Sequence, residues 1–179
     1  MLVKTLFAGF GGQGIMSMGL NLTQAAMLEG KYVTYLPSYG AEVRGGTAHC
    51  MVIISDQEIG SPYIKKADTL IIMNQPSFEK FKGYLISDGF LIVNSSLAEE
   101  SGYPKKSLLL KHPFTEIAIE LGNIKVANMV ALGLYIAGKK IITLQTVLDV
   151  IKDFAPEDKK GLIEVNRQAL SRGFRVNQG

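Results

Sequence analysis

The chain has 179 residues, of which 47% are hydrophobic and 20% charged, a composition that predicts one soluble globular domain over residues 1–179 and excludes a disordered chain. Its 19 Lys and Arg against 16 Asp and Glu leave a net charge of +3 without a dense basic tract, so we expect no nucleic-acid partner. The N-terminus lacks an export signal and no apolar run reaches about 18 residues, which predicts a cytoplasmic protein that does not enter a membrane.

The first predicted strand and helix are joined by a glycine-rich turn. Residues 2–8 are mostly aliphatic, aromatic or β-branched, which predicts a buried strand, and 15–29 contains no Pro, which predicts a helix. Glycines let the backbone turn sharply, and a helix begins with free N–H groups at the positive end of its dipole. We therefore expect either an anion or partner site, or only close packing of strand and helix, at four residues: Gly11, Gly12, Gln13 and Gly14.

The spacing of Gly9, Gly11 and Gly14 is also that of the dinucleotide-binding motif G-x-G-x-x-G. The full motif needs an acidic residue at the end of the second strand to hold the ribose hydroxyls. Here the second predicted strand, 32–36, runs into Pro-Ser-Tyr-Gly, and the first acid after it is Glu42. A nicotinamide site therefore lacks its second anchor.

The loop 37–46 contains a single cation, Arg44, followed by Gly45 and Gly46. A guanidinium group matches the geometry of carboxylates and phosphates, and the glycines would let the backbone approach a ligand closely. We predict a ligand-binding or interface loop at Arg44, Gly45 and Gly46, with a solvated surface arginine as the alternative.

Metal chemistry is limited by one cysteine, Cys50, and two histidines, His49 and His112. An iron–sulfur cluster needs about four cysteines and a structural zinc site about four Cys or His ligands, so we expect no metal on this chain alone. His49 and Cys50 fall in the third predicted strand, 47–54, where adjacent side chains point to opposite faces. We interpret Cys50 as a small core residue and not as half of a Cys–His nucleophile pair.

The fourth and fifth predicted strands, 69–73 and 90–93, each end in a polar loop. In an open α/β sheet, ligands and partners meet the carboxyl ends of the strands, so these loops should share an edge with the glycine turn and Arg44. They supply four further candidates for ligand or interface binding: Asn74, Gln75, Asn94 and Ser95.

Helices dominate the last third of the chain. The segment 124–137 is apolar nearly all round, which predicts burial, and its Gly133 would allow close approach of another helix or subunit. Thr143 predicts the N-cap of the next helix and Pro156 the start of the last one. With a short strand at 107–111, the elements predict an α/β fold: a Rossmann-like, mainly parallel sheet flanked by helices, with a helical C-terminal third.

A set of short segments occurs in one order and at characteristic separations. The set consists of Gly-Phe-Gly-Gly-Gln-Gly-Ile at 9–15, Tyr-Gly-Ala-Glu-Val-Arg-Gly-Gly at 39–46, Ile-Ser-Asp at 54–56, Met-Asn-Gln at 73–75, Asn-Ser at 94–95 and Asn-Met-Val-Ala-Leu-Gly at 128–133. Together these segments resemble the gamma subunit of 2-oxoacid:ferredoxin oxidoreductases, enzymes that act on pyruvate, 2-oxoglutarate or branched-chain 2-oxoacids. The resemblance covers most of the chain.

This resemblance implies conversion of a 2-oxoacid and coenzyme A to an acyl-CoA and carbon dioxide, with electrons passed to ferredoxin. Family members use thiamine diphosphate, Mg²⁺ and iron–sulfur clusters, distributed over alpha, beta, gamma and delta chains. This sequence has one Cys, and it has no Gly-Asp-Gly followed by Asn to hold thiamine diphosphate, because Asp88-Gly89 is preceded by Ser87 and is interpreted as a turn. We therefore expect no cofactor on this chain, all of them on the partner subunits, and no activity of the isolated chain.

The hypothesis for this subunit is a supporting role. It would pack against the thiamine-bearing subunits and use the loops at 12–14 and 44–46 to order the interface or to contact coenzyme A. Two alternatives are a stand-alone NAD- or flavin-binding oxidoreductase and a non-enzymatic module that binds an anionic metabolite at the glycine turn.

Overall fold

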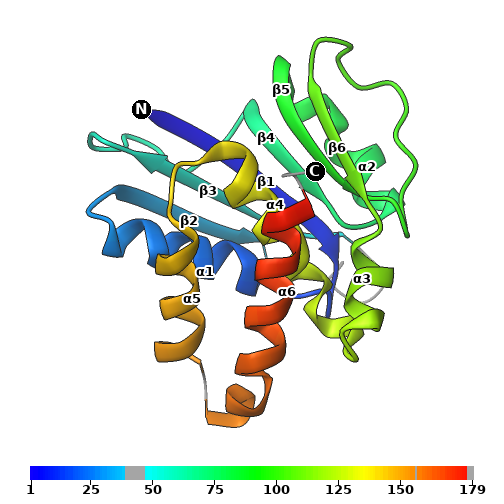
Figure 1. Cartoon of the computed structure of the whole chain (residues 1–179). Helices are drawn as coiled ribbons and strands as arrows, with labels where there is room; N and C mark the ends of the chain where they lie inside the picture. The colour runs from blue at the N-terminus through cyan, green and yellow to red at the C-terminus, as the bar shows by residue number, and fades with distance from the viewer. Residues whose placement is uncertain (39–46, 156, 177–179) are drawn as a thin grey trace.

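The computed structural model describes residues 1–38, 47–155 and 157–176 (Figure 1). Within these ranges six strands form one sheet in the order β2-β3-β1-β4-β5-β6. The strands are β1 (Leu2–Phe10), β2 (Tyr32–Ser38), β3 (Thr47–Ser55), β4 (Ala67–Ile72), β5 (Leu85–Asn94) and β6 (Leu108–His112). Every predicted strand is present.

The sheet is mainly parallel, as predicted, but it contains one reversed strand. β1, β4, β5 and β6 pair in parallel, whereas β3 pairs antiparallel with both β1 and β2. β2 ends at Ser38 and β3 begins at Thr47, whereas a parallel pairing of consecutive strands would need a crossover of about a dozen or more residues. The chain therefore folds back on β2, and β3 lies between β2 and β1.

One predicted turn is wrong. Asp88 and Gly89 lie inside β5, where the pairing with β4 shifts register between Ala67 and Thr69. Extra residues of β5 are accommodated at this irregularity, and Gly89 fits there because a Cβ would crowd the Leu85 side chain.

Six α-helices flank the sheet in the described ranges (Figure 1). They are α1 (Ile15–Leu28), α2 (Gln75–Phe81), α3 (Phe114–Glu120), α4 (Ala127–Lys139), α5 (Leu144–Asp153) and α6 (Ile163–Val176), with short 3₁₀ turns η2 (Lys82–Tyr84), η3 (Ile124–Val126) and η4 (Glu157–Leu162). One apolar core joins one sheet face to α1, α3, α4, α5 and α6. A second core joins the opposite face to α2.

The helix ends follow mostly from local signals. Asn74 caps α2 by accepting a hydrogen bond from the Ser77 N–H (2.9 Å), and Thr143 caps α5 through the Thr146 N–H (3.2 Å). The Thr143 cap was predicted. The predicted start at Pro156 lies outside the described residues, and α6 follows η4.

α4 is buried along most of its length, as predicted, and α6 is the helix that approaches it at Gly133. A Cβ at Gly133 would lie 2.8 Å from the backbone N of Phe174 and closer still to the Leu170 carbonyl oxygen. A Cβ at Gly173 of α6 would likewise meet the Val130 backbone. The two glycines therefore let the helix backbones touch.

Candidate functional site

The glycine turn joins the carboxyl end of β1 to the N-terminus of α1. Gly12 has φ of 94° and Gly14 has φ of 71°, a left-handed region that glycine adopts at least cost. The Gln13 N–H donates to the Phe10 carbonyl (3.2 Å), which closes the turn. The strand thus enters the helix within four residues of its end.

Gln13 ties this turn to the neighbouring strand β4. Its side-chain Oε1 accepts hydrogen bonds from the Phe10 N–H (2.6 Å) and from Asn74 Nδ2 (3.0 Å), while its Nε2 donates to the Met73 carbonyl (3.3 Å). The amide that the sequence suggested as a ligand is therefore hydrogen-bonded within the chain. Its contribution to ligand binding stays a prediction.

The polar loops after β4 and β5 meet at the same carboxyl edge. Asn94 Nδ2 donates to the Met73 carbonyl (3.3 Å) and to Thr115 Oγ1 (2.9 Å). Asn74 and Asn94 are both buried, so their amides fix the edge and present little surface to solvent. The structure thus brings Gln13, Asn74 and Asn94 together around the Met73 carbonyl.

The other sequence candidates are more peripheral or cannot be placed. Gln75 accepts from the Glu99 N–H (2.7 Å) and donates to Glu79 (3.1 Å), and the Ser95 N–H donates to the His112 carbonyl (2.9 Å). Arg44, Gly45 and Gly46 lie outside the described residues.

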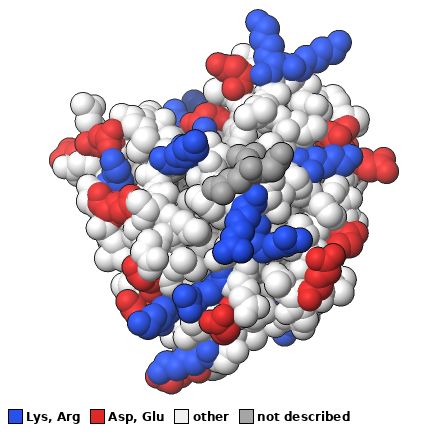
Figure 2. Space-filling view, viewed as in Figure 1, with Lys and Arg blue, Asp and Glu red and all other residues white. Residues whose placement is uncertain are grey.

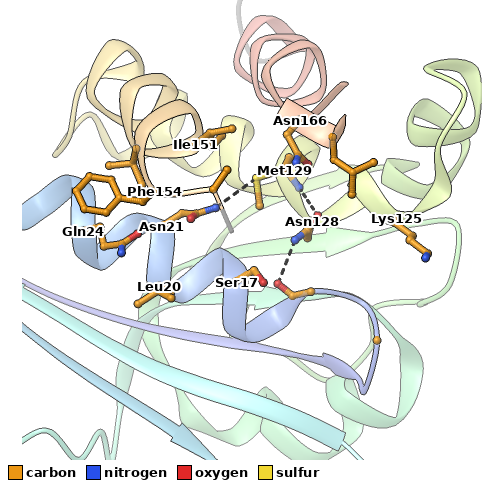
Figure 3. Close-up of a pocket in the computed structure, with 15 residues that line it drawn as sticks. Ser17, Leu20, Asn21, Gln24, Lys125, Asn128, Met129, Ile151, Phe154 and Asn166 are labelled. Carbon is orange, nitrogen blue, oxygen red and sulfur yellow. Dashed lines mark hydrogen bonds between the residues drawn. The ribbon is translucent and has the colours of Figure 1, made fainter. Parts of the chain in front are cut away.

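A cavity of about 330 Å³ opens at the N-terminus of α1, between α1, α4, α5 and α6 (Figure 3). Gly12 and Gly14 line it, and the described residues around it include no acidic side chain. Its polar lining consists of Ser17, Asn21, Gln24, Lys125, Asn128 and Asn166. Leu20, Ile151 and Phe154 supply part of the apolar wall.

No side chain of α1 offsets the positive end of its helix dipole at this cavity. α1 has no side-chain N-cap and no acidic residue in its first turn, and its first intrahelical bond runs from the Met18 N–H to the Gly14 carbonyl (2.9 Å). The preceding N–H groups have no acceptor within the helix, and the dipole places positive potential there. A Cβ at Gly12 would meet no atom within 4 Å, so a ligand can approach this backbone.

Asn128 holds the turn from the opposite side of the cavity (Figure 3). It is 5% exposed, and its Nδ2 donates to the Gly14 carbonyl (3.1 Å). Any side chain at Gly14 would run into this amide, which is a second reason for glycine there besides its positive φ. Asn128 therefore fixes the conformation of the turn where it borders the cavity.

Most of the cavity lining was missed from the sequence. Ser17, Asn21 and Gln24 are spaced i, i+4 and i+7 along α1, so they form a polar stripe on a mostly apolar helix. That polar stripe could have indicated the cavity from the sequence. Lys125 and Asn166 come from η3 and α6, and no local pattern connects them to the glycine turn.

Cys50 is a core residue, as predicted. It is fully buried under α1, its Sγ donates to the Ile15 carbonyl (3.5 Å), and burial raises the pKa of the thiol to about 12. His49 lies on the other side of the strand and packs against the ring of Phe81, with centroids 4.7 Å apart. The two side chains therefore cannot form a nucleophile pair.

In the described part of the chain, no cluster of three or more His, Cys, Asp or Glu side chains is placed to bind a metal ion. None of the helices within residues 1–38, 47–155 and 157–176 combines the length and apolar character that a bilayer crossing requires.

The sequence matches the family model described as pyruvate ferredoxin/flavodoxin oxidoreductase over residues 4–176. Ketoisovalerate oxidoreductase subunit VorA of Methanothermobacter thermautotrophicus is 38% identical over 96% of this chain, which spans 35% of that relative. 2-Oxoglutarate synthase subunit KorC of Methanocaldococcus jannaschii is 36% identical over 94% of this chain and 90% of its own length.

The fold is also that of a solved structure. The gamma subunit of keto/oxoacid ferredoxin oxidoreductase from Geobacter sulfurreducens superposes with a TM-score of 0.83 at 30% identity, covering 97% of this chain and 96% of that one. The chain therefore spans about a third of the VorA relative and nearly all of the KorC and Geobacter chains.

Proposed function

The chain belongs to the pyruvate ferredoxin/flavodoxin oxidoreductase family, and from this premise we propose that it is the small, gamma-type subunit of a 2-oxoacid:ferredoxin oxidoreductase complex. The complex would convert a 2-oxoacid and coenzyme A to an acyl-CoA and carbon dioxide and pass electrons to ferredoxin. Support comes from the match along nearly the whole of the KorC and Geobacter chains, which also favours one domain over 1–179.

We assign the redox and thiamine chemistry to the alpha, beta and delta subunits. The residues of this chain do not fit an iron–sulfur cluster, because its one cysteine is fully buried and its thiol stays protonated at neutral pH. The chain also lacks the Gly-Asp-Gly and Asn pattern for thiamine diphosphate, and Asp88-Gly89 is part of β5. The isolated subunit is therefore expected to be inactive.

The observation that carries the proposed role of this subunit is the N-terminus of α1, which has no side-chain cap and adjoins a cavity whose described lining residues include no acid. Free backbone N–H groups, the helix dipole and Lys125 all favour a negative group there. The surrounding side-chain amides can orient its oxygens through hydrogen bonds. We propose that this cavity receives an anionic group, either a phosphate of coenzyme A or a carboxylate of a partner subunit.

The sheet topology argues against a stand-alone NAD- or flavin-binding enzyme. In a dinucleotide fold the second strand lies beside the first, and its carboxyl end holds the ribose next to the glycine turn. Here the antiparallel β3 separates β2 from β1, so the end of β2 lies two strand spacings away, about 10 Å. The glycine turn still leads into a helix N-terminus, but the strand end that would hold the ribose does not lie beside it.

Reconstitution tests the proposal. The chain is co-expressed with the alpha, beta and delta subunits, and assembly and acyl-CoA formation are measured with and without it. We expect co-elution of the chain and loss of acyl-CoA formation in its absence. Oxidation of a 2-oxoacid by the isolated chain, or full turnover of a complex that lacks it, would contradict the proposal.

A second measurement separates the two anions. Coenzyme A should raise the melting temperature of the complex, and Lys125→Ala should reduce that shift if the cavity binds a phosphate. If assembly weakens and the shift is unchanged, the carboxylate of a partner subunit is the occupant. Lys152→Ala, an exposed lysine of α5 that does not line the cavity, is the matched control.

A further inference from the structure

A second concave surface lies on the outer side of α6, away from the cavity at α1. A hollow of about 340 Å³ is formed there by one stripe of α6 and by Leu121 just beyond α3. The stripe consists of Glu164, Arg167, Gln168, Ser171, Arg172 and Arg175. We call this surface the arginine groove.

The arginine groove is the face of α6 that the fold leaves uncovered. Its residues recur at i, i+3, i+4, i+7, i+8 and i+11, which places them on one side of the helix. The opposite side, with Leu170 and Gly173, is buried against α4. In Figure 2, drawn in the same view as Figure 1, Lys and Arg side chains gather over α6.

The groove carries an excess of positive charge. Among the described residues of the groove, one ion pair is present, between Glu164 Oε2 and Arg167 Nη1 (3.3 Å). In the part of the chain that the structure describes, no acidic side chain forms an ion pair with Arg172 or Arg175, and both are exposed. Two exposed guanidinium groups, with ten N–H donors between them, thus line the hollow.

The helix itself explains only part of this arrangement. The negative end of the dipole stabilises a cation in the last turn, and that accounts for Arg175. Arg172 lies before that turn, and like charges spaced i, i+3 oppose helix formation by roughly 0.2–0.5 kcal/mol. A stripe selected for helix stability alone would carry a neutral or acidic residue at position 172 and keep the cation at 175. The observed pair fits recognition of an acidic group from outside the chain.

The geometry favours a protein carboxylate over a free phosphate or a nucleic acid. The groove lies along the side of a helix, whose backbone N–H groups are already used, so only side chains can donate. It is also near the negative end of α6, which disfavours a compact multivalent anion. The described residues of the groove include no aromatic ring on which a nucleic-acid base could stack.

We propose that the arginine groove docks an acidic segment of a partner subunit, with Arg172 and Arg175 each binding a carboxylate and Leu121 contacting an apolar side chain of the same segment. Guanidinium groups pair with carboxylates in bidentate geometry, which gives the contact a defined register. This inference rests on the proposed function, since the segment belongs to another chain of the complex. The groove and the cavity at α1 would then contact the assembly at two separate places.

The test measures assembly of the chain with its co-expressed partner subunits. The variant Arg172→Glu/Arg175→Glu is compared with Lys105→Glu/Lys106→Glu. The second variant changes the net charge by the same amount, at two exposed lysines of a loop that is distant from α6 in the sequence. We expect the arginine variant to raise the dissociation constant roughly tenfold or more, and the lysine variant to leave it within about twofold. Added salt should weaken the unaltered complex and have little further effect on the arginine variant.

Circular dichroism and thermal melting of both double variants establish that they are folded. Unchanged affinity of a folded arginine variant would overturn the inference and leave the proposed function intact, because the complex still forms. Failure of the unaltered chain to assemble would overturn both. If single-stranded oligonucleotide or coenzyme A, tested as separate probes, bound the groove in an arginine-dependent way without any effect on assembly, the protein-docking inference would also be wrong.

Discussion

Replacing Gly133 by Ala is the most direct test of the packing that supports the site. The substituted Cβ would lie 2.8 Å from Phe174 N and 3.0 Å from the Leu170 carbonyl carbon, whereas unstrained carbon contacts are about 3.5–4.0 Å. The obstructing atoms are backbone, so no side-chain rotation relieves the clash, and α6 must move away from α4 by roughly 1 Å. That movement reduces dispersion contacts along the whole helix pair.

Two opposing effects set the magnitude. Alanine is favoured over glycine inside a helix by about 1 kcal/mol. Overpacking of a rigid interior costs typically 1–3 kcal/mol, and a clash with backbone belongs at about 3 kcal/mol. We therefore expect Gly133→Ala to lower the free energy of unfolding by about 2 kcal/mol and the melting temperature by about 4–8 °C.

Urea denaturation followed by circular dichroism measures this difference. Gly83→Ala is the matched control, since Gly83 is exposed in η2, has no positive φ, and its Cβ would meet no atom within 4 Å. Gly173→Ala should destabilise similarly, and the double variant by less than the sum, because helices already separated by one methyl group accommodate the second more easily. A Gly133→Ala chain as stable as the Gly83→Ala chain would refute the reasoning.

Three further outcomes are expected. Ser17→Asp places a carboxylate in the first turn of α1, so it should raise the free energy of unfolding by about 0.5 kcal/mol in thermal melts. If the cavity binds a phosphate of coenzyme A, the same variant should abolish the stabilisation of the complex by coenzyme A. Burial raises the pKa of Glu29, but hydrogen bonds from Thr146 and Thr143 outweigh burial, so the pKa is lowered overall. The stability that this carboxylate contributes is present above its unfolded-state pKa and is lost as the pH falls through its folded-state pKa. The urea midpoints at about pH 7 and about pH 3 should therefore differ less in Glu29→Gln than in the unaltered chain. Cys50 should react with a thiol reagent at about pH 8 only as fast as the chain unfolds, and rapid labelling of the folded protein would contradict its burial.

Strands, helices and most of their ends were predictable because their signals are local. The apolar runs of the strands, the Thr143 cap and the glycines of the first turn each act within a few residues of the structure they specify. The pairing of the strands was harder to predict from the sequence. The place of β3 between β2 and β1 depends on which edge of the sheet the β2–β3 pair joins. Asp88-Gly89 has the local sequence of a turn, although pairing with β4 holds this part of the chain in a strand.

For the candidate site, too, the sequence predicted local features better than contacts between distant segments. The glycine turn was found because a single stretch of sequence contains it, whereas Lys125 and Asn166 reach the cavity from η3 and α6, far along the chain. Amide side chains have a second role that the sequence did not indicate. Gln13 and Asn74 stay candidates for ligand or interface binding, and in the structure they also satisfy backbone N–H groups of their own loops.

This second role changes how the anion site should work. Gln13 bridges the turn to β4, and Asn128 joins it to α4, so the turn is fixed from both sides before any ligand binds. The groups then left for a ligand are the backbone N–H donors at the start of α1, next to a cavity that Gly12 and Gly14 line. Because these donors are held in place by packed helices and not by a flexible loop, little conformational entropy is lost when an anion binds. The buried amides therefore contribute to binding through the geometry of the turn, while the backbone supplies the contact.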